Sequence, residues 1–323
     1  MALISKAEYS PDQSLINCLS VPESEILRVM EGRITETYMY DDPRWRKIRD
    51  EAIGNRGLSW RRLLGRLIRA QGRNGRDQAE IRRTYDQHYG ATTTVLDWLN
   101  ALDERTQPVE WRDNGMVVTP QAVRVVHLLF LSQAIKTLKP RRVLEVGCGN
   151  GNMLFSLAVT FPDIEFSGVE LNTAGVALAH KAQELETLPD SFARVCAAPM
   201  RDSTAHRRVS IQAADARALP FPDRGFDLVY TRLALEQMEQ IRPQALSEIT
   251  RVADSAVALI EPWRDFNKSD PGKAYIRRMG YFNGKSSDLG LYGFTPILVT
   301  DDIPQKVQFR AGPVIALRKQ VSR

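Results

Sequence analysis

The feature that most constrains this chain is a short apolar run that ends in three alternating glycines. Residues 143–152 read VLEVGCGNGN, with glycine at 147, 149 and 151. Glycine permits sharp turns and close approach to a ligand, because it has no Cβ. The run therefore predicts a strand, a tight turn and a helix over Asn152–Thr160 whose free N–H groups point toward a ligand.

Short β-rich runs alternate with helical patterns from Thr119 onward. This alternation predicts βαβ units and a parallel sheet covered on both faces. Two later runs are separated by Ala-Gly-Pro and predict an antiparallel C-terminal hairpin of Lys306–Arg310 and Val314–Arg318. The other expected strands are Arg142–Val146, Ile164–Val169, Val209–Ala213, Phe226–Tyr230 and Ala256–Glu261, and the helices are 120–138, Asn152–Thr160, Ala174–Glu186 and Pro243–Val252.

Residues 1–118 show helical patterns and few strand-like runs. After Ser59, apolar side chains at 60, 63, 64, 67 and 68 follow helical spacing to about Gln71, and a shorter pattern covers 95–102. We therefore expect a mainly helical N-terminal domain or extension over 1–118, and a second domain over 119–323.

The formal charge of +5 is concentrated in one window. Between Arg56 and Arg83 nine arginines accompany Asp77 and Glu80, which gives a local charge of +7. We interpret the apolar stripe of this window as packing on the second domain or on another copy of the chain, so a homodimer through the N-terminal helices is expected. The alternative is contact of the arginines with an anionic glycan, nucleotide-sugar, membrane surface or RNA.

Composition narrows the class further. The three cysteines form no CxxC pair, which excludes a disulfide framework and a cysteine-rich zinc site. No histidine pair has metal-ligand spacing, so no metal is indicated. No apolar run approaches the roughly 18 residues of a membrane span, and the N-terminus lacks signal-peptide features. We therefore expect a cytoplasmic protein.

Acidic residues follow two of the predicted strands. Glu170 ends the second strand, where its carboxylate is placed to accept hydrogen bonds from ribose hydroxyls, and Asp215 follows the third strand near an adenine amino group. The polar Asn152 replaces the third glycine of the dinucleotide fingerprint, so the loop fits NAD poorly.

Four motifs in order resemble the class I S-adenosylmethionine-dependent methyltransferases, in the branch that acts on small molecules and glycans. They are VLEVGCGNG at 143–151, GVELN at 168–172, DARALPFPDRGFDLVY at 215–230 and LIEP at 259–262. The resemblance covers about 120–323. It implies an α/β, Rossmann-like, seven-stranded doubly wound sheet with a reversed last strand, and S-adenosyl-L-methionine as the cofactor.

The resemblance also implies which residues hold the cofactor. The stretch from Glu170 to Asp215 is longer than the compact family pattern, so the insertion at 187–208 predicts a loop near the site. The implied cofactor residues are Glu145, Gly147, Cys148, Gly149 and Gly151 for the methionine part, Glu170 and Leu171 for the ribose, Asp215 and Ala216 for the adenine, and Thr231, Arg232 and Leu233 beneath the sulfonium.

Three side chains are candidates for orienting or deprotonating an acceptor. Glu236 follows the fourth strand by one turn, Glu261 closes the fifth, and His127 lies in the helix before the sheet. Each has a structural alternative: an exposed helix start for Glu236, a strand-end cap for Glu261 and a core histidine for His127.

The acceptor is predicted only by class. After the fourth strand the chain reads Tyr-Thr-Arg-Leu, without the prolines of the base-stacking turn in nucleic-acid amino-methyltransferases, so a nucleic-acid base is an unlikely target. The leading hypothesis is O-methylation of a small polar metabolite, sugar or glycan. The alternatives are an N-methyltransferase for a protein or RNA docked through the Arg56–Arg83 arm, and a non-catalytic scaffold.

Overall fold

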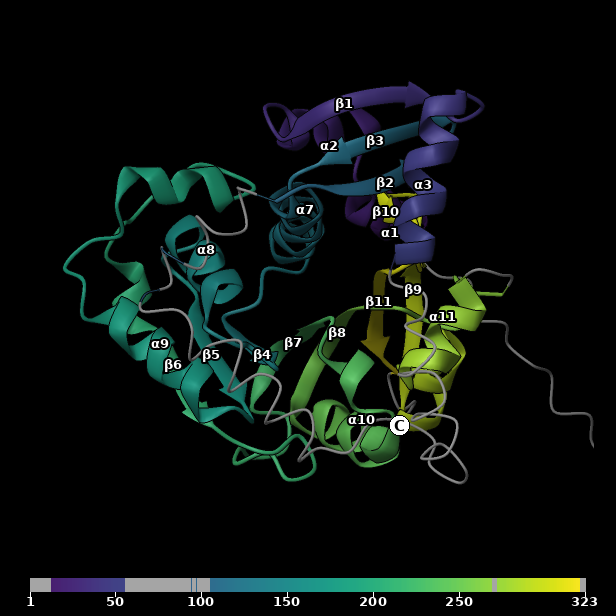
Figure 1. Cartoon of the computed structure of the whole chain (residues 1–323). Coiled ribbons are helices and arrows are strands. Elements are labelled where there is room, and N and C mark those ends of the chain that lie inside the picture. The colour runs from purple at the N-terminus through teal and green to yellow at the C-terminus, as the bar shows by residue number, and fades with distance from the viewer. Residues whose placement is uncertain (1–12, 56–93, 95–96, 98–104, 269–271, 320–323) are drawn as a thin grey trace, which may run out of the picture.

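The computed structural model describes residues 13–55, 94, 97, 105–268 and 272–319. Within them, a seven-stranded sheet carries helices on both faces and a separate four-stranded sheet lies at the top of Figure 1. The Arg56–Arg83 window, almost all of the helical pattern at 95–102 and the homodimer contact expected through them lie outside the described residues.

The large sheet has the order β6-β5-β4-β7-β8-β11-β9, and its first five strands are parallel. This confirms the predicted Rossmann-like α/β fold. The chain runs outward from β4 through β5 to β6 and then returns to the other side of β4 at β7, which creates a switch point beside β4 where open α/β sheets bind ligands. These strands are β4 Arg142–Val146, β5 Glu165–Glu170, β6 Ser210–Ala213, β7 Phe226–Arg232, β8 Ala253–Glu261, β9 Phe294–Val299 and β11 Gly312–Arg318.

Helices cover the two faces of this sheet because alternate strand residues point in opposite directions. On β4, Val143 packs in the core cluster of α7, α8 and α9, whereas Leu144 and Val146 pack in the cluster of α10. The helices are α7 Pro120–Leu138, α8 Asn152–Thr160, α9 Thr173–Gln183, α10 Arg242–Val252 and α11 Gly272–Met279, and the short 3-10 turns are Asp190–Val195, Ala205–Arg208, Leu235–Gln237, Glu239–Ile241 and Ser286–Tyr292.

The C-terminal hairpin differs from the prediction in its first strand. Val314–Arg318 lies in β11 as expected, but its antiparallel partner is β9, and Lys306–Arg310 is not a strand of this sheet. Strand β9 contains Pro296, which has no N–H to donate, and its position at the sheet edge tolerates that loss. Residues Gln305–Lys306 instead form β10 and pair with β2.

Before residue 119, the described residues contain three short strands beside three helices. The four-stranded antiparallel sheet has the order β1-β3-β2-β10. The Asp-Asn-Gly at 113–115 belongs to a tight hairpin in which Trp111 pairs with Asn114 and Arg112 adopts φ 53°. The elements are α1 Gln13–Leu19, α2 Glu23–Met30, β1 Ile34–Met39, α3 Pro43–Asn55, β2 Gln107–Trp111, β3 Asn114–Val118 and β10 Gln305–Lys306.

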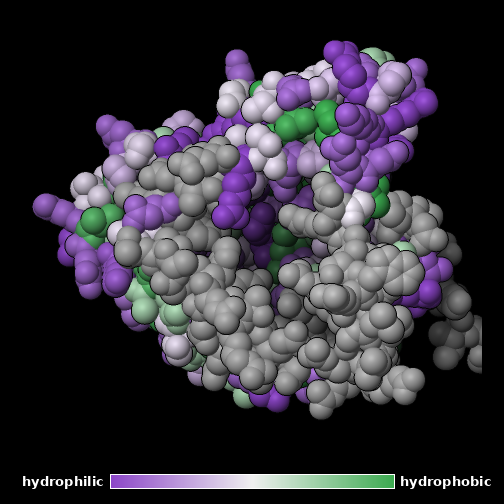
Figure 2. All heavy atoms as spheres, in the orientation of Figure 1, coloured by the Kyte–Doolittle hydropathy of each residue, from purple (hydrophilic) through white to green (hydrophobic). Residues whose placement is uncertain are grey.

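The four-stranded sheet draws on both predicted domains, since β1, β2 and β3 come from residues 1–118 and β10 comes from the C-terminal part. The division at residue 118 therefore stays a prediction. Helix α7 packs against α1, α2 and the interior strands β8 and β11 of the large sheet, and it follows directly after β3 of the small sheet (Figure 1). Hydrophilic side chains cover α3, at the upper right of Figure 2.

No helix among the described residues is both long and apolar enough to cross a membrane. In the same part of the chain, no three His, Cys, Asp or Glu side chains cluster in a way that could hold a metal ion.

Candidate active site

A cavity of about 280 Å³ lies at the carboxyl ends of the parallel strands. It is therefore at the switch point beside β4, where a ligand is expected. Its wall comes from four segments that follow β4, β5, β6 and β7. The lining residues are Glu145, Val146, Gly147, Cys148, Gly149, Asn150, Asn152, Met153, Val169, Glu170, Leu171, Asn172, Ala214, Asp215, Ala216, Arg232, Leu233, Ala234, Glu236, Gln237, Met238 and Ile241.

The glycine loop turns sharply because all three of its glycines have left-handed backbone angles. Gly147, Gly149 and Gly151 have φ of 82°, 57° and 76°. A Cβ on Gly147 would lie 2.5 Å from the Cβ of Ala234, so the loop packs directly against the segment after β7. Gly151 supports the turn without lining the cavity. A side chain at these positions would strain the backbone, and at Gly147 it would also displace its neighbour.

Glu170 is fixed by the backbone around it. One carboxylate oxygen accepts from the N–H of Gly149 at 2.9 Å and the other from the N–H of Asn172 at 2.9 Å. Burial raises the pKa of this carboxyl, while the backbone donors act in the opposite direction. Two oxygens with about four acceptor positions still have capacity for a ligand's hydroxyl groups.

At the end of β6, Asp215 and Ala216 line the cavity as predicted. The Asp215 carboxylate already has a partner in the protein. It forms an ion pair of 2.6 Å with the Arg217 guanidinium and accepts from the backbone N–H of Arg217 at 2.9 Å. An adenine amino group would share this carboxylate with Arg217. The predicted insertion at 187–208 contributes no residue to the cavity, and its second turn packs against α8 instead.

Glu145 lies beneath the glycine loop, almost fully buried on β4. Its neighbour in register on β7 is Tyr230, whose hydroxyl donates to the Glu145 carboxylate at 2.8 Å. Burial raises the pKa of Glu145 to about 8, so the carboxyl holds its proton at neutral pH until a cation approaches it.

Glu261 does not line the cavity, which argues against the predicted role as a base in contact with the acceptor. It is fully buried at the end of β8, where it accepts from the Thr231 hydroxyl and from the N–H groups of residues 234, 235 and 236, at 2.7–3.1 Å. Burial raises the pKa of Glu261 to about 8 although these donors favour the charged form. The carboxyl thus caps the turn that presents Glu236, and Thr231 supports it from behind the cavity wall.

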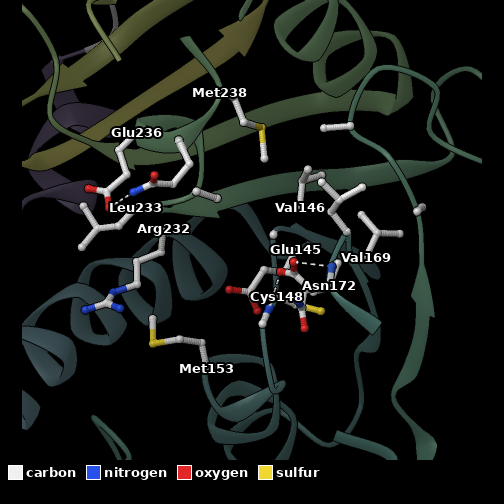
Figure 3. Close-up of a pocket in the computed structure, with 18 of the residues that line it drawn as sticks. Glu145, Val146, Cys148, Met153, Val169, Asn172, Arg232, Leu233, Glu236 and Met238 are labelled. Carbon is white, nitrogen blue, oxygen red and sulfur yellow. Dashed lines mark hydrogen bonds between the residues drawn. The ribbon is translucent and has the colours of Figure 1, made fainter. Parts of the chain in front are cut away.

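Glu236 does line the cavity and is largely buried. The side-chain amide of Gln237 donates to its carboxylate at 2.9 Å and orients it. Figure 3 shows Glu236 and Arg232 on one side of the cavity and Asn172 and Val169 on the other. Glu236 therefore faces the cavity from the side opposite Asn172 and Val169.

His127 lies on α7 behind this wall and does not line the cavity. Burial, and then the nearby charges of Arg232 and Lys306, lower the pKa of His127 well below its usual value. The imidazole is therefore neutral, and its Nδ1 accepts from the Nε of Arg232 at 3.2 Å. It orients Arg232, and its role as a base stays a prediction.

Several residues of the wall were not predicted from the sequence. Asn150 is 2% exposed, and within the described residues its side-chain amide nitrogen has no hydrogen-bond partner. A buried donor without an acceptor is costly, which indicates that a ligand meets it. The sequence signal was the polar residue between two loop glycines. Met153, Gln237 and Met238 gave no such signal.

Comparison with known proteins agrees with this geometry. Residues 144–260 match the family described as a methyltransferase domain. Over 125 residues the chain is 30% identical to ajmaline N-methyltransferase of Rauvolfia serpentina, with 38% of this chain and 35% of that protein covered. Over 173 residues it is 26% identical to the O-methyltransferase rstn1 of Aspergillus nomiae, with 54% and 66% covered.

The solved structure of the [4+2]-cyclase SpnF shares the fold, with a TM-score of 0.53 and 16% identity over 77% of this chain and 98% of that one. Residues 144–260 have the sequence of a methyltransferase domain, and S-adenosylmethionine is the cofactor of the methyltransferases that the chain resembles. The chain spans about a third of the length of the ajmaline N-methyltransferase and about two thirds of the length of the O-methyltransferase rstn1. The names of these two relatives specify different methylated atoms, nitrogen and oxygen.

The residues present fit this cofactor. Glu170 has acceptor capacity for two ribose hydroxyls, and Asn150 has a buried donor without an acceptor in the described residues. Glu145 would receive the amino group of the methionine part and give up its proton in response. The predicted cofactor residues thus surround one cavity, apart from Gly151 and Thr231.

Proposed function

We propose that this protein transfers a methyl group from S-adenosylmethionine to a hydroxyl group of a small polar molecule, such as a metabolite or sugar. The observation that carries the proposal is the Glu236 carboxylate, which lies on the cavity wall and is oriented by Gln237. A hydroxyl is a weak nucleophile unless a base removes its proton, whereas a neutral amine needs less help.

Each part of the wall has a role in this proposal. The cofactor, when bound, supplies a methyl group on a positively charged sulfur. Glu236 accepts the proton of the acceptor hydroxyl, and Glu261 holds the turn that carries Glu236 through three backbone N–H groups and Thr231. Leu233 and Met238 exclude water from the same side of the cavity. Orientation of the two reactants supplies much of the rate.

Turnover with methyl-labelled S-adenosylmethionine and a metabolite extract, followed by mass spectrometry of the product, tests the proposal. We expect the label on an oxygen atom. The Glu236→Gln variant keeps the shape of the side chain but cannot accept the proton, so its rate should fall about 100-fold.

The matched control is Glu165→Gln, at the exposed start of β5 and outside the cavity, which should turn over like the unaltered protein. Label on nitrogen, or an unchanged rate for Glu236→Gln, would contradict the proposal. Cofactor binding without any transfer would favour the scaffold alternative.

A further inference from the structure

The acceptor side of the cavity contains an arginine that is oriented by a histidine from another element. Arg232 ends β7 and lines the cavity, and its Nε donates to the Nδ1 of His127 on α7 at 3.2 Å. Because His127 is neutral, this contact fixes the direction of the guanidinium without cancelling its charge.

A second arginine adds positive charge beneath the same wall. Arg124 lies one helical turn before His127 on α7 and is 2% exposed. Its guanidinium donates to neutral oxygens only, namely those of Asn152, Ser156 and Val195, at 2.6–3.0 Å. Although burial lowers the pKa of Arg124 to about 9, the group stays charged at neutral pH.

Glu145 does not offset these charges, since burial raises its pKa to about 8 and, once ionised, its carboxylate would pair with the amino group of the cofactor. Glu236 lies on the same side of the cavity as Arg232 and is outnumbered by the cations. Lys306 contributes a further positive charge near His127, in a small cavity that shares Leu233 as a lining residue with the main one. Charges in a low-dielectric wall act strongly on a ligand, so this end of the cavity favours an anion.

We propose that Arg232, positioned by His127, recognises an anionic group of the methyl acceptor, a carboxylate or a phosphate. The acceptor is then a small molecule with both an anionic group, which meets Arg232, and a hydroxyl, which meets Glu236 on the same side of the cavity (Figure 3). A guanidinium binds either anion through paired N–H donors. This inference rests on the proposed methyl transfer and specifies its substrate class.

Three phenols that differ only in one substituent test the inference. The protein is saturated with S-adenosylhomocysteine and titrated calorimetrically with 4-hydroxybenzoate, 4-hydroxyphenyl phosphate and the neutral 4-hydroxybenzamide. We expect at least one anionic phenol to bind about tenfold more tightly than the amide, as one charge-assisted contact implies. Comparison of the carboxylate with the phosphate identifies which anion the site prefers.

Variants assign the preference to the two residues. Arg232→Gln should lower the affinity for the anionic phenol to that for the amide, and it should leave the affinity for the amide unchanged. His127→Leu should remove most of the preference, whereas His127→Asn, whose oxygen can replace Nδ1 as the acceptor, should restore it. Arg142→Gln, exposed at the opposite end of β4, is the matched control and should keep the full preference.

Three results would overturn the inference: equal binding of all three phenols or none, a preference that survives Arg232→Gln, and a loss of S-adenosylhomocysteine affinity in Arg232→Gln as large as the loss for the anionic phenol. The last would show that the guanidinium holds the cofactor's own carboxylate. Failure of the unaltered protein to bind S-adenosylhomocysteine would overturn the proposed function and with it this inference. Cofactor binding without anion preference would overturn this inference alone.

Discussion

The two sides of the cavity are built in different ways. On the side of β4 and β5, ligand-facing groups are held by backbone that is near in sequence: Glu170 by the N–H groups of Gly149 and Asn172. On the side of β7, they are held by side chains from distant elements, Glu261 on β8 and His127 on α7. The difference suggests that the first side keeps a fixed ligand, whereas the second can change with the acceptor.

The largest effect on stability is expected from a substitution on the β7 side of the cavity, which depends on contacts with distant elements. Glu261→Ala removes the acceptor of one hydroxyl and three backbone N–H groups. Because each buried donor left unsatisfied costs about 1–3 kcal/mol, the free energy of unfolding should fall by about 3–5 kcal/mol. Urea denaturation measures the change.

Glu261→Gln is the control, since one oxygen remains for three of the four donors. It should cost about 1 kcal/mol. If the alanine variant is as stable as the glutamine variant, the turn does not depend on Glu261 and the contrast between the two sides fails.

The next effect concerns the locally built side. Glu170→Ala removes the carboxylate that we expect to hold the ribose hydroxyls. It should weaken S-adenosylhomocysteine binding by about 2–4 kcal/mol, measured by isothermal titration calorimetry. Glu165→Ala, at the other end of β5 and exposed, should bind like the unaltered protein. Similar affinities for the two variants would mean that Glu170 only shapes the loop.

The smallest effect per measured step is a pH dependence from Glu145, the buried acid on β4. Burial raises the pKa of Glu145 from an ordinary 4.5 to about 8, so between these values the folded protein holds a proton that the unfolded chain has released. Its contribution to stability is therefore complete below pH 4.5 and is lost as the pH rises toward 8.

The free energy of unfolding should fall by about 1 kcal/mol per pH unit across this window because of Glu145. Glu145→Gln, which stays neutral, should show a shallower slope when denaturation is repeated at several pH values. Parallel slopes for the two proteins would show that Glu145 is already ionised in the folded state.

The division between local and distant contacts also separates the elements that the sequence predicted from those that it did not predict. The strand β4, the helix α8 and the residues around the glycine loop were predicted with correct bounds, because their hydrogen bonds connect neighbours in the chain or adjacent parallel strands. The position of β10 and the partner of β11 were not predicted, because both depend on which distant strand offers an unpaired edge.

The sequence by itself determined the parallel α/β fold, the ligand-binding turn and the carboxylate of Glu170, since glycine conformations and strand periodicity are local properties. Only the tertiary structure decided what Glu261, His127 and Arg232 do. Arg232 meets a histidine 105 residues away, and Glu261 meets a turn about 30 residues before it. Whether an acid faces the cavity, as Glu236 does, or caps a turn, as Glu261 does, is decided only when the whole chain packs.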